Sequence, residues 1–86
     1  MNKPTITIEK DGPNANIYAI MGIAHAAMME EGFRALRLSK DYLRDADLIV
    51  TNATTLGNLM KNKAMHAASY EEALETIEAY VTINWI

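Results

Sequence analysis

One long segment of the chain is apolar on almost every side. If the residues from Asn16 to Glu31 form a helix, little of its surface is polar before Glu30. Two stripes then run along it at intervals of three and four residues. The apolar stripe contains Ile17, Met21, Ala24 and Met28, and a second stripe of small residues contains Ala15, Ala19, Gly22 and Ala26. A helix that is apolar nearly all round is the central helix of its domain or part of an interface.

The residues that flank this segment predict where the helix begins and ends. Asn14 or Asn16 is suited to the N-cap position, where a side-chain oxygen accepts a hydrogen bond from a free backbone amide. Gly32 is suited to the left-handed position that follows a helix, which places the last helical residue near Glu31. A glycine inside a helix costs about 1 kcal/mol relative to alanine. We therefore expect Gly22 and the small stripe to let another backbone approach closely.

Two short segments near the ends of the chain alternate between apolar and polar residues, which is the pattern of a half-buried strand. The first, residues 5–9, places Ile6 and Ile8 on one face, and the last places Ile83 and Trp85 on one face. We expect these two strands to pair. Because a two-stranded sheet is marginal by itself, it must lie on the helices or join its copy in another subunit.

The residues between these elements predict two further helices before a C-terminal one. They cover residues 39–50, with Ser39 as a possible cap, and residues 54–66. The inward residues are expected to be Leu43, Ala46 and Val50 in the first, and Leu56, Leu59, Met60 and Ala64 in the second. The segment 48–51 contains β-branched residues and is also compatible with a short strand.

A capping box predicts the start of the last helix. Ser69 can accept a hydrogen bond from the amide of Glu72, and the Glu72 side chain can reach back to the helix start. The apolar face of this helix contains Tyr70, Ala73, Leu74, Ile77 and Val81. Its other face carries four glutamates, so the C-terminal helix is acidic.

Together these elements predict a small α+β domain of the order β-α-α-α-β, in which the N- and C-terminal strands pair beside a helical layer. The 86 residues form one domain, residues 1–86, and a chain of this size buries only about 60 to 65% of its unfolded surface. Without cysteine, neither a disulfide nor a thiolate zinc site can support so thin a core. We therefore expect a homo-oligomer, which buries further apolar surface.

Composition also limits where in the cell the protein is expected and which kinds of partner it can bind. No apolar run near the N-terminus is long enough for a signal peptide or a membrane span, which predicts a cytoplasmic protein without a membrane partner. The net charge of -3 argues against general binding of nucleic acid. The middle of the chain, however, is basic.

No pattern typical of catalysis or metal binding is present in the sequence. Neither His25 nor His66 has a histidine or carboxylate three or four residues further on, as a metal site on one helical face requires. No serine lies in a nucleophile elbow, and no glycine-rich phosphate loop is found. We expect no enzyme activity, no metal and no cofactor, and we expect His25 at the boundary of the core with a hydrogen-bond partner.

Two groups of polar residues suggest a site for an anionic ligand. Asn14 and Asn16 lie in the turn before the long helix, where free backbone amides can bind an anion. The three arginines of the chain, with Lys40 among them, share one side of a helix if a single helix includes them all. They are Arg34, Arg37 and Arg44. Arginine clusters hold phosphates, but a plain helix cap and a solvated basic face explain the same residues without a ligand.

Residues 11–22 read DGPNANIYAIMG, and residues 69–74 read SYEEAL, followed by Tyr80 and Val81. These two ends resemble small proteins encoded by bacteriophages and prophages, in which a strand and a Gly-Asn-Ala turn lead into a helix with an Ile-Met-Gly segment. The resemblance implies a phage or mobile-element origin. It implies no activity, because none is attached to the group, and it transfers no functional residue.

From these observations we expect a non-catalytic binding protein of phage type that acts, as a homo-oligomer, on a component of the host cytoplasm. It would either inhibit a host protein or sequester an anionic nucleotide signal, the second with the three arginines and the amides near Asn14 and Asn16. One alternative is a structural or regulatory protein-interaction module of a phage or mobile element. Another is a nucleic-acid-binding accessory protein that uses the basic middle segment.

Overall fold

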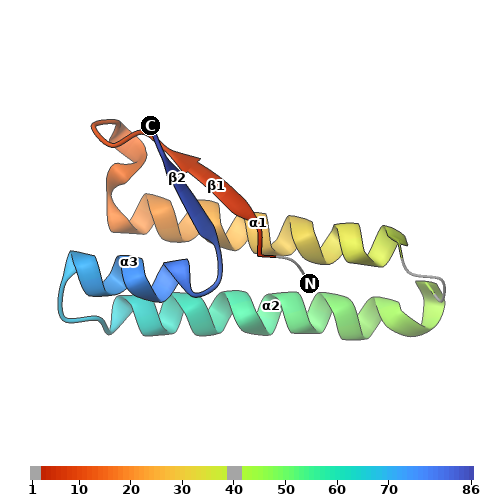
Figure 1. Ribbon diagram of the computed structural model, residues 1–86. Helices are drawn as coiled ribbons and strands as arrows, with labels where there is room; N and C mark the ends of the chain where they lie inside the picture. Colours follow the sequence, from red (N-terminus) through yellow and green to blue (C-terminus); the bar gives the residue numbers. More distant parts are fainter. Residues whose placement is uncertain (1–2, 39–41) are drawn as a thin grey trace.

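The computed structural model describes residues 3–38 and 42–86, and of residues 42–45 the backbone only. The elements are β1 (Thr5–Ile8), the short 3-10 turn η1 (Pro13–Ala15), α1 (Ile17–Leu38), α2 (Tyr42–Met65), α3 (Tyr70–Glu78) and β2 (Thr82–Trp85). Figure 1 shows α1 and α2 as a long antiparallel hairpin, with α3 and the two strands at one of its ends. The predicted order β-α-α-α-β is confirmed.

The two strands form a parallel pair. Thr5 lies beside Thr82 and Ile8 beside Trp85, and the Thr82 amide donates a hydrogen bond of 2.8 Å to the carbonyl of Pro4. Parallel pairing follows from the connection between them, because three helices carry the chain back to the end from which it started.

Each strand has the alternation that the sequence predicts. Ile6 and Ile8 are buried, and Ile83 and Trp85 are partly buried against the same core. The other residues of the two strands are exposed. The predicted pairing and the predicted inner faces are therefore both confirmed.

Helix α1 begins where the sequence predicts. The Oδ1 atom of Asn16 accepts a hydrogen bond of 2.9 Å from the amide of Ala19, and the Asn16 Nδ2 donates to the carbonyl of Pro13 at 2.9 Å. Asn16, and not Asn14, is thus the residue that caps the helix.

The predicted end of α1 near Glu31 is wrong, because the helix continues for about two more turns to Leu38. Gly32 has no positive φ and does not terminate the helix. It faces α2 instead, where a Cβ atom on Gly32 would lie 2.7 Å from the Cβ of Ala53. Leu36, one turn later, is buried. Packing against α2 therefore extends the helix beyond its local stop signal.

The prediction of two helices between residues 39 and 66 is also wrong, as is the alternative of a strand at 48–51. Helix α2 runs unbroken from Tyr42 to Met65, and Ser39 lies outside the described residues. The threonines and asparagine of residues 51–55 weaken the helix locally. The buried side of α2, however, repeats at helical spacing through Ala53, Gly57, Met60 and Ala64. Most of the stability of a helix comes from such packing.

Helix α3 starts at the predicted capping box. The Glu72 amide donates to the Ser69 Oγ at 3.1 Å, and the Glu72 side chain accepts from the amide of Ala68 at 3.3 Å. The hydroxyl of Tyr70 also donates to the carbonyl of Ala15 at 2.7 Å. This last bond fixes the start of α3 to the turn before α1.

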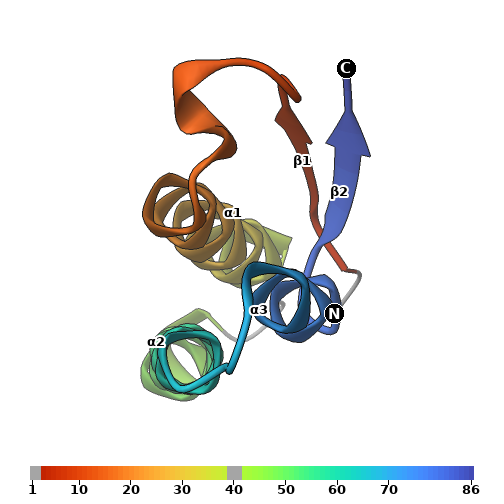
Figure 2. The same cartoon turned by 90° about the vertical axis from the view of Figure 1, so that its left-hand side faces the viewer.

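The core lies where α1 meets α3, the sheet and the C-terminal part of α2. Figure 2 shows the hairpin end-on, with the sheet on the opposite side of α1 and α3 from α2. Ile8, Ile20, Met60, Ile77 and Val81 are completely or almost completely buried there. Every described helix and both strands contribute to this one core.

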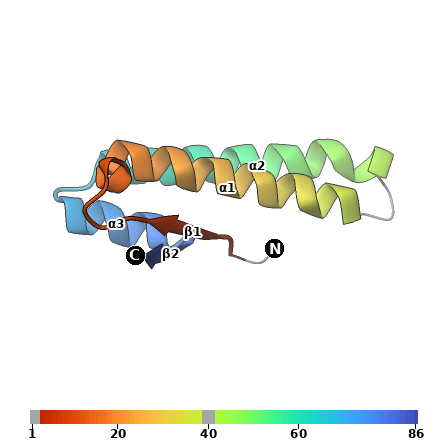
Figure 3. The ribbon, with the colours of Figure 1, turned by 90° about the horizontal axis from the view of Figure 1, so that it is seen from above.

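Beyond this core, α1 and α2 continue with no other described helix or strand beside them, as Figure 3 shows from above. We call this part, residues 29–38 of α1 and 42–55 of α2, the hairpin arm. The arm gives the molecule extents of 42 × 26 × 17 Å and a radius of gyration of 13.8 Å. A compact chain of the same length would have a radius of gyration of about 12 Å.

Candidate interaction surface

The structure places the residues predicted to bind an anionic ligand at opposite ends of α1. Asn14 and Asn16 precede the first turn, whereas Arg34 and Arg37 lie in the last two turns. At 1.5 Å per residue, Asn16 and Arg34 are about 27 Å apart along the helix axis. Arg44 belongs to a different helix, α2, and its side chain is outside the described part of the chain. The structure therefore does not bring these residues into one small site.

The asparagines and arginines of that predicted site either have a structural role or are exposed to solvent. The side chain of Asn16 is used by the cap, and its carbonyl accepts a hydrogen bond of 3.0 Å from the Ile20 amide. Asn14 is exposed. Arg34 forms an ion pair of 3.3 Å with Glu31, one turn earlier, and Arg37 is exposed.

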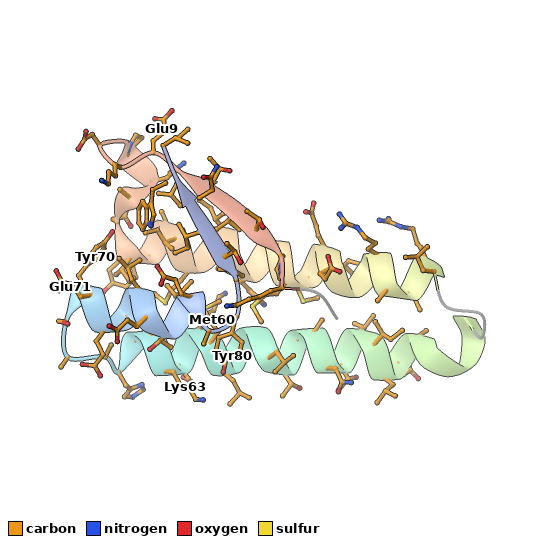
Figure 4. The ribbon with its side chains drawn as sticks, in the orientation of Figure 1. Glu9, Met60, Lys63, Tyr70, Glu71 and Tyr80 are labelled. Atoms are coloured by element: carbon orange, nitrogen blue, oxygen red, sulfur yellow. The ribbon has the colours of Figure 1, made fainter. Side chains whose placement is uncertain are left out.

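A groove of about 370 Å³ lies where the hairpin arm meets α3 and the start of β1. Its lining combines apolar residues with one charge of each sign: Lys3, Pro4, Met28, Glu31, Ala53, Leu56, Ala79 and Tyr80. Met28 and Ala53 are buried, and Tyr80 is half-buried. Figure 4 shows Tyr80 where the end of α3 meets α2, close to the level of Met60. The groove therefore opens at the point where α3 stops covering the hairpin.

Exposed leucines continue this apolar surface along α2. Leu48, Leu56 and Leu59 have exposed fractions of 62%, 38% and 43%. At 100° per residue these three side chains fall within about 80° of the helix circumference, and we call them the leucine face. Leu38, at the end of α1, is 78% exposed. The prediction that Leu56 and Leu59 point inward is therefore wrong.

The leucine face is also free of charge. From residue 48 to residue 60 the sequence contains no Asp, Glu, Lys or Arg, and its remaining polar residues are threonines and asparagines. An exposed side of a helix in a soluble domain normally carries charged residues. One sequence pattern could have identified this face. The buried side of α2 follows from the helical spacing of Ala53, Gly57, Met60 and Ala64, and the three leucines lie outside it.

The small stripe of α1 lies on a different side of the hairpin. Gly22 and Ala26 are exposed, and a Cβ atom on Gly22 would meet nothing within 4 Å. Within the chain the close approaches occur at the two other helical glycines: Gly32 faces Ala53, and a Cβ on Gly57 would overlap the ring of His25.

The described residues offer little for acid–base or metal chemistry. Among them no three His, Cys, Asp or Glu side chains lie close enough to hold a metal ion. The Nε2 of His25 is buried beside α2 and has no hydrogen-bond partner among the described residues, so the predicted partner is not found for this atom. Burial, and then the positive charge of Lys61, lower the pKa of His25 below its usual value.

In the part of the chain that the structure describes, no helix combines the length and apolarity that a membrane crossing requires. Comparison with known proteins finds no matching family model, no matching curated protein and no matching solved structure.

Proposed function

We propose that this chain is a non-catalytic binding protein whose working surface is the groove together with the leucine face. The observation that carries this proposal is the uncharged, exposed row of Leu48, Leu56 and Leu59 beside a groove with a buried apolar floor. Contiguous exposed apolar patches on soluble domains mark surfaces that bind other proteins or apolar ligands. The rim of this surface carries Lys3 and Glu31, in keeping with the polar edge that surrounds most protein interfaces.

A protein partner fits this surface better than a phosphorylated small molecule. Asn16 and Arg34, both expected to hold phosphate, lie about 27 Å apart along α1, and Glu31 partly neutralises Arg34. The groove contains a single lysine. Among the roles expected from the sequence, the inhibitor of a host protein and the protein-interaction module therefore gain support over the sequestration of a nucleotide signal.

The surface also suggests how a partner would bind. The groove is lined by Ala79 and Tyr80, just beyond the end of α3, and by Ala53 and Leu56 of α2. It therefore suits an apolar helix that occupies the position of a missing further turn of α3. Amphipathic helices bind to grooves of this kind through apolar residues spaced three and four apart. The resemblance to phage proteins makes a host protein the expected source of such a helix.

A photo-crosslinking amino acid at position 56 tests this proposal in the cells that produce the protein. We expect a discrete adduct with another protein, and we expect the adduct to disappear when Leu48→Glu is added. Leu48 is exposed, so this second change leaves the fold intact. The matched control places the same amino acid at Glu75, on the exposed side of α3. Equal adducts from position 75, or no adduct with another protein from position 56, would overturn the proposal.

A further inference from the structure

The hairpin arm is a two-helix layer that lacks its third helix. Helices α1 and α2 contain 22 and 24 residues and are about 33 and 36 Å long, whereas α3 contains 9 residues and is about 14 Å long. Figure 1 shows that α3 covers only the end of the hairpin near the sheet. Two helices alone bury one face each, so a second apolar face on the arm stays open to solvent.

The chain exposes more surface than a compact monomer of its mass, as expected if a neighbouring layer is missing. The isolated chain exposes 5735 Å². A compact monomer of 9.6 kDa would expose about 5,100 Å². The excess of about 600 Å² approaches the roughly 800 Å² that each partner contributes to a stable interface of standard size.

We propose that a second copy of this chain supplies the missing layer, with two arms packed leucine face to leucine face as an antiparallel four-helix bundle. This inference rests on the proposed function, since it uses the same surface, and it names the occupant of that surface when no other partner is bound. Two-fold symmetry joins identical patches. A two-fold axis near residue 53 of α2 would place Leu48 of one copy over Leu59 of the other.

The distribution of charge favours the arm over the other helical surface as the place where two copies meet. The arm contains three arginines and four acidic residues and is nearly neutral, and the leucine face, which extends from the arm to Leu59, carries no charge at all. Helix α3 carries four glutamates and no basic residue. Two copies that met through α3 would repel each other, whereas two arms would not.

The solution mass of the purified protein tests the inference. At concentrations of tens of micromolar we expect sedimentation equilibrium to give twice the 9.6 kDa mass of the chain. The double variant Leu48→Glu, Leu59→Glu should return the mass to that of one chain. Both leucines are exposed in the single chain and glutamate is a good helix former, so circular dichroism should show an unchanged helix content.

Met65→Glu is the matched control, because Met65 is an exposed apolar residue of the same helix on a different side. This variant should keep the doubled mass. A single-chain mass for the unmodified protein at every concentration would overturn the inference. So would a doubled mass that survives the double variant, or one that Met65→Glu removes equally well.

A cysteine crosslink tests the antiparallel arrangement independently, because the chain has no cysteine of its own. Asn52→Cys lies near the expected two-fold axis and should form a covalent dimer under mild oxidation, whereas Glu75→Cys should not. Covalent dimers from position 75 alone would overturn the arrangement.

The two proposals fail in different ways. If the unmodified chain is a monomer but position 56 still crosslinks to another protein, the dimer is wrong and the binding function stands. If the chain is a dimer and position 56 crosslinks only to its own copy, the dimer stands and the binding function is wrong.

Discussion

The two halves of the α1–α2 hairpin are built from the same pair of helices and have different surroundings. In the half near the sheet, α3 and both strands cover the helices, and Ile20, Met60 and Ile77 are completely buried. In the hairpin arm the two helices pack mainly against each other, and Gly32 lies so close to Ala53 that a Cβ atom on it would be 2.7 Å from the Ala53 Cβ. A helix that is apolar on two sides needs two neighbours. The chain supplies both near the sheet and only one in the arm.

The largest expected effect is a difference in the free energy of unfolding between substitutions in the two halves. Ile77→Ala removes a completely buried side chain of α3 and should lower the free energy of unfolding by about 2 to 5 kcal/mol. Leu48→Ala in the arm should lower it by about 0.5 kcal/mol or less in the single chain. Urea unfolding at low protein concentration measures both. A loss at Leu48 as large as that at Ile77 would show that the arm is buried as well as the sheet end.

The next effect tests what holds the arm together. Gly32→Ala places a methyl group against the fixed Cβ of Ala53, so the two helices must separate locally, which should cost about 1 to 3 kcal/mol. Gly22→Ala, in the same helix, meets open space and should stabilise the protein by up to about 1 kcal/mol. Thermal unfolding should therefore shift in opposite directions for the two variants. Equal shifts would mean that the Gly32–Ala53 contact does not hold the arm.

A smaller effect concerns the attachment of α3 to the sheet end. Tyr70→Phe removes the hydroxyl that donates to the carbonyl of Ala15 and should cost about 1 kcal/mol in the free energy of unfolding. Tyr18→Phe, at an exposed position on α1, is the control and should change nothing measurable. If Tyr70→Phe and Tyr18→Phe had the same free energy of unfolding, the hydrogen bond from Tyr70 to Ala15 would not help to hold α3 over the core.

The smallest effect depends on pH and concerns His25, which lies between α1 and α2 beside Gly57. Burial and Lys61 lower the pKa of His25 in the folded protein below the 6.5 of a free histidine. The unfolded chain therefore binds a proton more readily, and stability should fall as the pH drops through about 6.5. Chemical unfolding at pH 7.5 and 5.5 measures this loss. It should shrink in His25→Gln and persist when exposed His66 is replaced by Gln; an unchanged loss in His25→Gln would contradict the prediction.

Local sequence signals predicted the elements that depend on a few neighbouring residues. The caps at Asn16 and Ser69 each form a hydrogen bond to a residue three positions further on, and the structure contains both. The alternation around Ile6 and Ile8 predicts which face of β1 is buried, although its partner strand lies at the other end of the chain. The pairing of the end strands was also predictable, because two isolated amphipathic strands have few other partners.

The errors in the helix boundaries concern contacts between α1 and α2. Gly32 predicts an end of α1, and the threonine and asparagine that follow residue 50 predict a break between helices at 39–50 and 54–66, because the local preferences of these residues are unfavourable to a helix. The packing of Gly32 against Ala53 reverses both outcomes, and the helix preferences of single residues do not contain that contact. The residues predicted to bind an anionic ligand are spread over two helices. The predicted site required Arg34 and Arg44 on one helix, whereas α1 ends at Leu38 and α2 begins at Tyr42.

The parallel pairing of β1 with β2 determines when this molecule can finish folding during synthesis. Thr5 cannot pair before Thr82 has been synthesised. The pairing of these two residues closes a loop that contains all of the chain between them. The α1–α2 hairpin can form as soon as residue 65 has left the ribosome. The inner faces of both strands, and the core beneath them, cannot close until Trp85 has emerged. A nascent chain therefore exposes its half-built core until translation has passed β2, and a premature stop before that point would leave β1 without a partner.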